Sequence, residues 1–360
     1  MTHLNDSIRN KVVDRLPEIL SLHGVSGREE QVQSYLTKEL ESLADSVTVD
    51  PLGNVISHIK GNGKQKLMVA AHMDEIGLMI KHIDQRGFLY FETIGGIRSQ
   101  NLYARECEVL TPKGKVPGIV NSIHPGRPLA DEYIPDAKDF FIDVGANNLA
   151  DIENMGIEVG QSVKFIYQFQ QLNNKVAGTA LDNRLLVFIL LEVLKVMKNE
   201  DQNNIPDLYP VFTVQEEVGS RGAQTATNQI KPDLAIALDI TMANDLPKIH
   251  ESEHIAEVDR GPGIKVVDNI SRAMLGLIVS DTIVKQMKDI AHSHHIPYQL
   301  EVQSAGSTDG ATIHREGNGV PTGGICLPTR YVHAYELASI DDTVHMANLL
   351  YESIKTLKVY

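Results

Sequence analysis

The sequence lacks the features that define several classes of protein. It has only two cysteines, Cys107 and Cys326, and no tryptophan in 360 residues. Two cysteines exclude a disulfide framework and a Cys-x-x-Cys metal motif, and they favour a reducing compartment. No apolar signal segment stands at the N-terminus, and the most apolar run, 185–197, contains a glutamate and a lysine. Because a membrane span needs about 20 apolar residues, we expect a soluble, cytoplasmic protein with no membrane partner.

Positive charge is also scarce. The chain has 33 Lys and Arg against 47 Asp and Glu, which gives a formal net charge of −14. Such an acidic chain is a poor partner for nucleic acid or anionic lipid, so we expect neither. Hydrophobic residues make up 42% and charged residues 22%, which is the composition of an ordinary globular protein. At roughly 150 residues per domain, this length favours two domains.

The first and last parts of the chain alternate between helical and strand patterns. Helical periodicity runs from 7 to 43 with a break at 23–30, where Ser26 is interpreted as the N-cap of a second helix. Apolar runs predict strands at 67–71, 208–214, 234–238 and 320–327, and amphipathic or apolar runs predict helices at 185–198, 281–292 and 342–357. This alternation predicts an α/β fold with a mostly parallel or mixed sheet flanked by helices.

The middle of the chain has a different pattern. Short β-rich runs between 77 and 173 are separated by turn clusters such as His124-Pro125-Gly126, and one helix is expected at 148–155. Closely spaced strands of this kind predict a small inserted β-barrel-like domain. We therefore expect a discontinuous catalytic α/β domain at 1–76 and 174–360, with residues 77–173 forming an insertion that serves dimerisation or substrate access.

Side chains that can bind metal lie next to the predicted strands and at the start of one predicted helix. They are His72 after 67–71, Glu216 and Glu217 after 208–214, Asp239 after 234–238, His333 after 320–327 and Asp182 before 185–198. In open α/β sheets, ligands bind at the carboxyl ends of the strands. We therefore expect these side chains to meet at one edge of one sheet.

Each of these residues alone also has a simpler explanation. A histidine after a buried strand is often structural, Asp182 could only cap a helix, and two adjacent glutamates are often a solvated strand end. Two details favour a metal site. Asp74 lies two residues after His72, where it can hydrogen-bond the imidazole and orient it. Asp239 would be costly to bury at the end of an apolar strand without a partner.

The glutamate pair predicts a division of roles. If Glu216 and Glu217 continue a strand, they point in opposite directions, so that one can bind metal while the other serves as a general base. The negative charges of Asp182, Glu217 and Asp239, with one hydroxide, balance two divalent ions. A neutral site with nitrogen and oxygen ligands suits zinc or cobalt better than calcium or magnesium. We therefore expect two divalent ions per subunit.

Six motifs together resemble a known family. They are AAHMDEIG at 70–77, ALDNR at 180–184, VQEEVGSRGA at 214–223, ALDIT at 237–241, GSTDGA at 306–311 and RYVHAYE at 330–336. In this order and at these separations, they are similar to the tetrahedral aminopeptidases, metallopeptidase family forty-two, which include bacterial glutamyl aminopeptidases. The resemblance covers the whole chain.

The resemblance implies an activity and a role for each site residue. The activity is hydrolysis of the N-terminal residue of short peptides, in a homo-oligomer built from dimers that can reach a hollow tetrahedral dodecamer. Related enzymes have a cis peptide bond at the position of Asp182-Asn183. The implied roles are His72 and Asp239 on one ion, Glu217 and His333 on the other, Asp182 bridging both, Glu216 as general base on a metal-bridging water, and Asp74 orienting His72. Ala334 departs from the family, which commonly has a small hydroxyl residue there.

Three other functions remain open from the sequence. They are a metal-dependent deacylase of N-acyl amino acids, a glycosidase that uses the glutamate pair, and a non-catalytic assembly protein of the same fold. Adjacent glutamates that point apart would not flank a glycosidic bond across about 5–10 Å, which weighs against the glycosidase. We expect residues 306–311 to help form the substrate side-chain pocket. A preference for an acidic substrate residue would need a basic group there, and this segment contains none.

Overall fold

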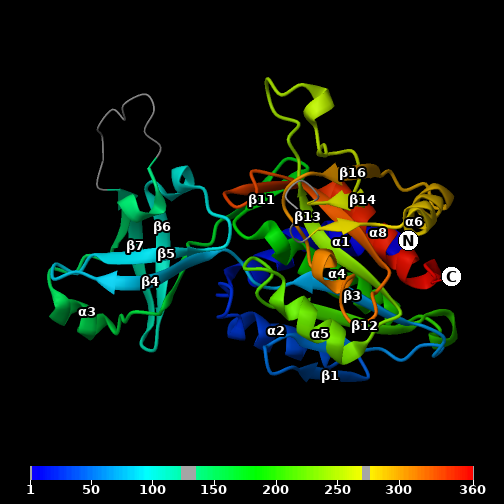
Figure 1. Cartoon of the computed structure of the whole chain (residues 1–360), viewed down its shortest axis with the longest axis horizontal. Helices are drawn as coiled ribbons and strands as arrows, with labels where there is room; N and C mark the ends of the chain where they lie inside the picture. The colour runs from blue at the N-terminus through cyan, green and yellow to red at the C-terminus, as the bar shows by residue number, and fades with distance from the viewer. Residues whose placement is uncertain (1, 123–134, 270–275, 360) are drawn as a thin grey trace.

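The computed structural model describes residues 2–122, 135–269 and 276–359. A mixed sheet flanked by helices makes up one part of the molecule, and a closed β-barrel stands beside it (Figure 1). The expected α/β fold with a small β-barrel is therefore confirmed. The turn expected at 124–126, including His124, lies outside the described residues.

Within the described residues, twelve strands form the large sheet. Its main order is β1 (Ser46–Val49), β2 (Val55–His58), β12 (Asp207–Thr213), β3 (Lys66–His72), β13 (Leu234–Met242), β17 (Thr322–Arg330), β18 (Glu336–Ser339), β11 (Lys175–Gly178) and β10 (Phe169–Leu172). A further strand, β14 (Gly263–Asp268), pairs with β17, and β15 (Leu277–Ile278) and β16 (Gln299–Gln303) pair with β14. The neighbours β12, β3, β13 and β17 are parallel, so their carboxyl ends lie at the same edge.

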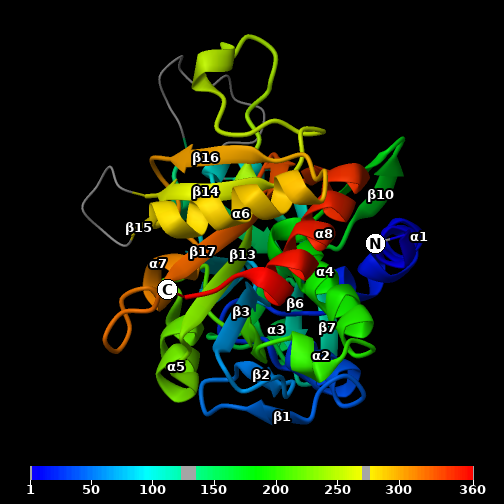
Figure 2. The same cartoon turned by 90° about the vertical axis from the view of Figure 1, so that its right-hand side faces the viewer.

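Helices cover both faces of this sheet (Figure 2). One face packs against α1 (Thr2–Ser21), α2 (Glu30–Leu40), α4 (Leu181–Met197), α6 (Asp281–Ser293) and α8 (Ile340–Thr356), and the other against α5 (Arg221–Ile230) and α7 (Gly310–Ile313). In β3, Leu67 and Val69 belong to the first core while Met68 and Ala70 belong to the second. A strand covered on both faces needs apolar residues on both, which explains the continuous apolar run in its sequence.

The barrel is closed by six antiparallel strands with a core of their own. In barrel order they are β4 (Gly77–Ile83), β5 (Leu89–Ile94), β8 (Phe140–Asp143), β7 (Gly114–Ser122), β6 (Arg105–Thr111) and β9 (Ser162–Phe165). The expected helix is present as α3 (Leu149–Met155), where the Asn148 side chain caps the start and Gly156, in the left-handed conformation, ends it.

The chain enters the barrel directly after β3 and returns through β9 to β10, which pairs with β11 in the large sheet. The expected domain limits of 1–76 with 174–360, and 77–173, stay a prediction, as does a role for the barrel in dimerisation or access. Among the described helices, none combines the length and apolarity needed to cross a membrane.

Three local predictions need correction. Ser26 is not the N-cap of α2; that position is Glu29, and the Ser26 hydroxyl instead donates to the buried carboxylate of Asp74 at 2.6 Å. Asp239 lies inside β13 and does not end it, because parallel pairing with β17 continues to Met242. The helix α5 was missed, although its buried residues recur at helical spacing on one face.

Candidate metal centre

The first group of candidate ligands forms around His72. This residue ends β3 and lies opposite Thr213 of β12, while its neighbour Ala71 pairs with Leu238 of β13. The register places Asp239 beside the imidazole, with 3.6 Å between His72 Nε2 and Asp239 Oδ1. Asp182, at the start of α4, places Oδ1 3.1 Å from the same nitrogen.

A second group forms around His333 and shares one residue with the first. His333 Nε2 lies 3.4 Å from Asp182 Oδ2 and 3.2 Å from Glu217 Oε2. In each group, His72–Asp182–Asp239 and Asp182–Glu217–His333, the ligand atoms all lie within 4.8 Å of one another. The two oxygens of Asp182 thus face two separate clusters.

The glutamate pair lies in a turn, which corrects the expectation of strand alternation. The strand β12 ends at Thr213, and Gln215 then adopts a positive φ of 55°. Glu216 and Glu217 still point to different places: Glu216 Oε2 is 4.0 Å from His72 Nε2, whereas Glu217 reaches His333. The different environments of the two carboxylates come from turn geometry.

Asp74 contacts both His72 and the turn that carries the two glutamates. Its Oδ1 lies 3.5 Å from His72 Nδ1, and its carboxylate accepts backbone N–H bonds from Glu216 at 3.0 Å and Glu217 at 3.2 Å. Together with the Ser26 hydroxyl, these donors surround a fully buried side chain. The sequence predicted contact with His72; it did not predict that Asp74 would also fix the glutamate turn.

The electrostatics of the protein groups alone indicate an excess of negative charge at the centre. Burial raises the pKa of Asp239 to about 6, and burial together with nearby carboxylates raises the pKa of Glu216 well above its usual value. Burial lowers the pKa of His333, but hydrogen bonds with Asp182 and Glu217 outweigh this and raise it to about 12. Carboxylates this close retain protons unless cations balance them.

The residues present fit divalent cations. Glu217 Oε1 is a buried atom for which the described part of the chain offers no hydrogen-bond partner, and Asp182 Oδ1 has only the His72 imidazole, 3.1 Å away, beside it. Buried carboxylate oxygens without a donor are costly, and metal coordination removes that cost. Two imidazoles and three carboxylates form the mixed nitrogen and oxygen set that zinc or cobalt accepts.

The centre opens into a cavity of about 470 Å³. Gly306, Ser307 and Thr308 line it, as expected of the 306–311 segment. Arg98, from the segment that follows β5, also lines the cavity and was missed, because it is far in sequence from every site motif. The cavity therefore contains a basic group that the sequence did not reveal.

Two acidic residues of the quoted motifs also lie at the centre without an expected role. Asp309 is buried and accepts a bond of 2.5 Å from Thr213 Oγ1, and Glu336 accepts the backbone N–H of both Asp182 and His333. The sequence signal that could have identified these two residues was their presence in the motifs GSTDGA and RYVHAYE.

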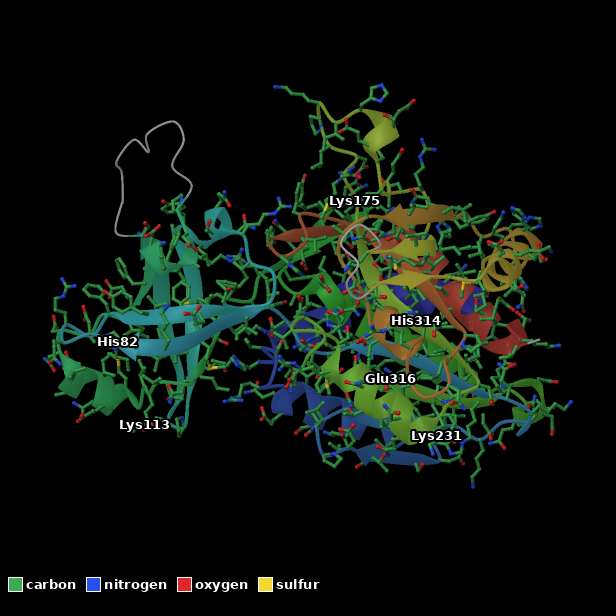
Figure 3. The ribbon with its side chains drawn as sticks, viewed as in Figure 1. His82, Lys113, Lys175, Lys231, His314 and Glu316 are labelled. Carbon is green, nitrogen blue, oxygen red and sulfur yellow. The ribbon has the colours of Figure 1, made fainter. Side chains whose placement is uncertain are left out.

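The other notable histidines lie elsewhere. His292, His294 and His295 lie at the end of α6, as expected of a solvated helix end, and none lines the cavity. Figure 3 shows His82 on the barrel, on the side away from the large sheet, and His314 on the part that contains the large sheet, at the end of α7. The bond between Asp182 and Asn183 is cis, as the resemblance implied.

Known proteins are similar to this chain over most of its length. Residues 53–349 match the family model described as M42 glutamyl aminopeptidase. A putative aminopeptidase of Acetivibrio thermocellus is 37% identical over 95% of this chain and 98% of its own length.

Solved structures show the same fold over nearly the whole chain. An aminopeptidase of the archaeon Desulfurococcus kamchatkensis is 36% identical with a TM-score of 0.90, covering 96% of this chain and 95% of that one. The TET1 peptidase of Pyrococcus horikoshii, described as assembling into a tetrahedron or a large octahedral shell, is 29% identical with a TM-score of 0.84, covering 96% of this chain and 100% of that one.

Proposed function

Since the chain belongs to the M42 family of metal-dependent aminopeptidases, we propose that it removes the N-terminal residue of short peptides at a centre for two divalent cations. His72 and Asp239 would hold one cation, Glu217 and His333 the other, and Asp182 both. The observation that carries this proposal is the sharing of Asp182 by two separate ligand groups. Zinc and cobalt are the proposed ions because the ligands are imidazoles and carboxylates.

The chemistry divides between the cations and Glu216. When bound, divalent cations polarise the scissile carbonyl and lower the pKa of the attacking water. Glu216 takes a proton from that water and passes it to the leaving amine. Burial and the neighbouring carboxylates raise the pKa of Glu216, which makes its carboxylate a stronger proton acceptor than an exposed glutamate.

The surrounding residues hold these groups in place. The bonds from the Glu216 and Glu217 backbones to Asp74 fix both carboxylates relative to His72. The lining of the cavity also includes Glu216 and Asp268, two carboxylates outside both ligand groups, which would favour the positively charged free N-terminus of a peptide. An acylated substrate lacks that charge.

The assembly and location are also proposed. The likeness to a TET peptidase that forms tetrahedral and octahedral shells supports a homo-oligomer, with a tetrahedral dodecamer built from dimers as the first candidate and the barrel as part of its contacts. Both cysteines are unpaired and buried, which supports a reducing, cytoplasmic location.

A panel of aminoacyl-p-nitroanilides with added Zn²⁺, Co²⁺ or Mn²⁺ tests the activity. We expect cleavage of at least one amino-acid derivative and none of its N-acetylated form. Preference for the acetylated form would support the deacylase instead, and activity on cellulose that survives metal removal would support the glycosidase. Purified protein that binds no divalent metal would support a non-catalytic role.

A further inference from the structure

One carboxylate connects two of the candidate ligands without facing either cation position. Glu336, the first residue of β18, is 2% exposed. Its Oε1 accepts the backbone N–H of His333 at 2.9 Å, and its Oε2 accepts the backbone N–H of Asp182 at 3.0 Å. The two residues are 151 positions apart in the chain, so one side chain joins the shared ligand to a ligand of the second group.

The backbone at His333 needs such support. Both Tyr331 and His333 have positive φ values, 62° and 63°, in a region that residues with a Cβ seldom occupy. The surrounding contacts must offset the cost of holding a residue there. The bond from the His333 N–H to Glu336 is one such contact, and it fixes the backbone from which the imidazole extends.

The barrel supplies two further contacts of this turn. Gly96, after β5, presents its carbonyl 2.7 Å from His333 Nδ1, and the Arg105 guanidinium of β6 donates to the carbonyl of Ala334 at 3.3 Å. A Cβ at Gly96 would lie 3.1 Å from His333 Nδ1, so the close approach depends on the missing side chain. The first group, His72 and Asp239, lies on strands of the large sheet.

Arg105 is itself held by the barrel. Its guanidinium lies over the ring of Phe165 at 4.4 Å, a cation–π contact between β6 and β9. Burial lowers the pKa of Arg105, and the negative charge of Glu336 raises it, because the two opposite charges attract each other. Arg105 and Glu336 line one small cavity together with His333 and Ala334.

We propose that Glu336 and Arg105 are positioning residues that set the affinity of the second cation position, the one formed by Glu217 and His333, through the His333 turn. The first position, formed by His72 and Asp239, depends on them less. The inserted barrel therefore takes part in metal binding as well as bordering the cavity. This inference rests on the proposed two-cation centre.

Metal titration of the apo-protein tests the proposal without substrate. Wild-type protein stripped of metal is titrated with Zn²⁺ by calorimetry and with Co²⁺ by visible absorption. Glu336→Gln keeps the size of the side chain but leaves one of the two backbone N–H groups without an acceptor. Residues that orient metal ligands typically change affinity by about 10–100-fold when replaced. We therefore expect the Zn²⁺ at the second position, identified as the binding step that Glu217→Gln weakens, to bind about 10–100-fold more weakly, and the other Zn²⁺ within about threefold of wild type.

Arg105→Met is the second variant, because Glu336→Gln could fail to fold. We expect it to weaken the second Zn²⁺ by about tenfold and Arg105→Lys by less. With saturating metal, kcat and KM should return toward wild-type values, which a general loss of folding would not allow.

Two matched controls separate positioning from stability. Arg86 lies over Phe88 at 5.1 Å, in the turn that follows β4 at the end of the barrel where His82 is labelled (Figure 3). Arg86→Met removes the same kind of contact from the same barrel. Asp342 also accepts two backbone N–H groups, from Asp259 and Gly261 at 2.7 Å each, and does not line the cavity. Asp342→Asn should lower stability and leave both Zn²⁺ affinities unchanged.

The outcomes distinguish this inference from the proposed function. Wild type that binds two Zn²⁺, with Arg105→Met and Glu336→Gln binding both as tightly, overturns the positioning role alone. Equal weakening of both ions in these variants also overturns it. Wild type that binds two Zn²⁺ and cleaves no peptide overturns the proposed activity and leaves the positioning role to be judged by the variants. Selective weakening of the second ion supports it.

Discussion

Replacing Glu216 by glutamine tests the assignment of the general base. The variant keeps the shape of the side chain, the Glu216 N–H bond to Asp74 and an oxygen that can accept from Ser220 Oγ. Only the ability to take and return a proton is lost. A positioned general base contributes about 10²–10⁴-fold to rate, or about 2.7–5.5 kcal/mol of barrier at 1.36 kcal/mol per tenfold.

The assay is steady-state hydrolysis of the best aminoacyl-p-nitroanilide, with metal content measured on the same samples. We expect kcat to fall by about 10²–10⁴-fold while both metals stay bound, because Glu216 Oε2 is 4.0 Å from His72 Nε2 and belongs to neither ligand group. Glu217→Gln should instead lose metal. Glu200→Gln, whose carboxylate bonds Tyr351 and Lys355 in α8, should change neither quantity. Turnover of Glu216→Gln within tenfold of wild type would refute the base assignment.

Three further predictions concern metal, buried charge and pH. Chelation with EDTA should abolish activity and lower the melting temperature, since the clustered carboxylates then repel one another. Added Zn²⁺ or Co²⁺ should restore both activity and melting temperature. Activity that persists in EDTA would contradict the metal requirement. Glu75→Gln should lower the free energy of unfolding in urea by about 3–5 kcal/mol, because it removes the ion-pair partner of the buried Lys164 and Arg184, 3.2 Å and 3.3 Å away. A loss under about 1 kcal/mol would contradict this. Burial lowers the pKa of His23 to about 4, against 6.5 in the unfolded chain, so its stabilising effect is complete above pH 6.5 and is lost as the pH falls toward 4. The difference is worth at most about 3 kcal/mol, and His23→Gln should flatten the pH dependence of unfolding in this range; an unchanged slope would show that His23 does not titrate there.

The sequence carried most of the fold because its periodicities are strong. The apolar run of β3, the apolar helix α4 and the turn-rich middle each have one interpretation that satisfies burial on the correct faces. The short elements were less predictable. The short strands β14 to β16 depend on the tertiary neighbours that cover them, because a few residues of local preference do not specify a strand. The helix α5 has an apolar face at helical spacing that was overlooked.

The structure brings the predicted ligand side chains together, but for reasons that differ in part from those expected, and their roles stay a prediction. The pairing of β3 with β13 brings His72 and Asp239 together as expected, although Asp239 lies inside β13 and not at its end. The separation of Glu216 from Glu217 was expected from strand alternation, and it arises from a turn that Asp74 fixes. Ser26 was expected to cap a helix, and it donates to the same carboxylate. Each of these contacts joins segments more than 45 positions apart, which local pattern does not encode.

By itself, the sequence determined which side chains could bind metal, on which kind of sheet edge they lie, and that a β insertion interrupts the chain. Only the tertiary structure decided that one aspartate faces two ligand groups, that Arg98 enters the cavity, and that the barrel reaches the turn of His333 through Gly96 and Arg105. The reason is physical: residue type and periodicity follow from local burial, whereas a site a few ångströms wide depends on the register and approach of segments that meet only when the chain has folded.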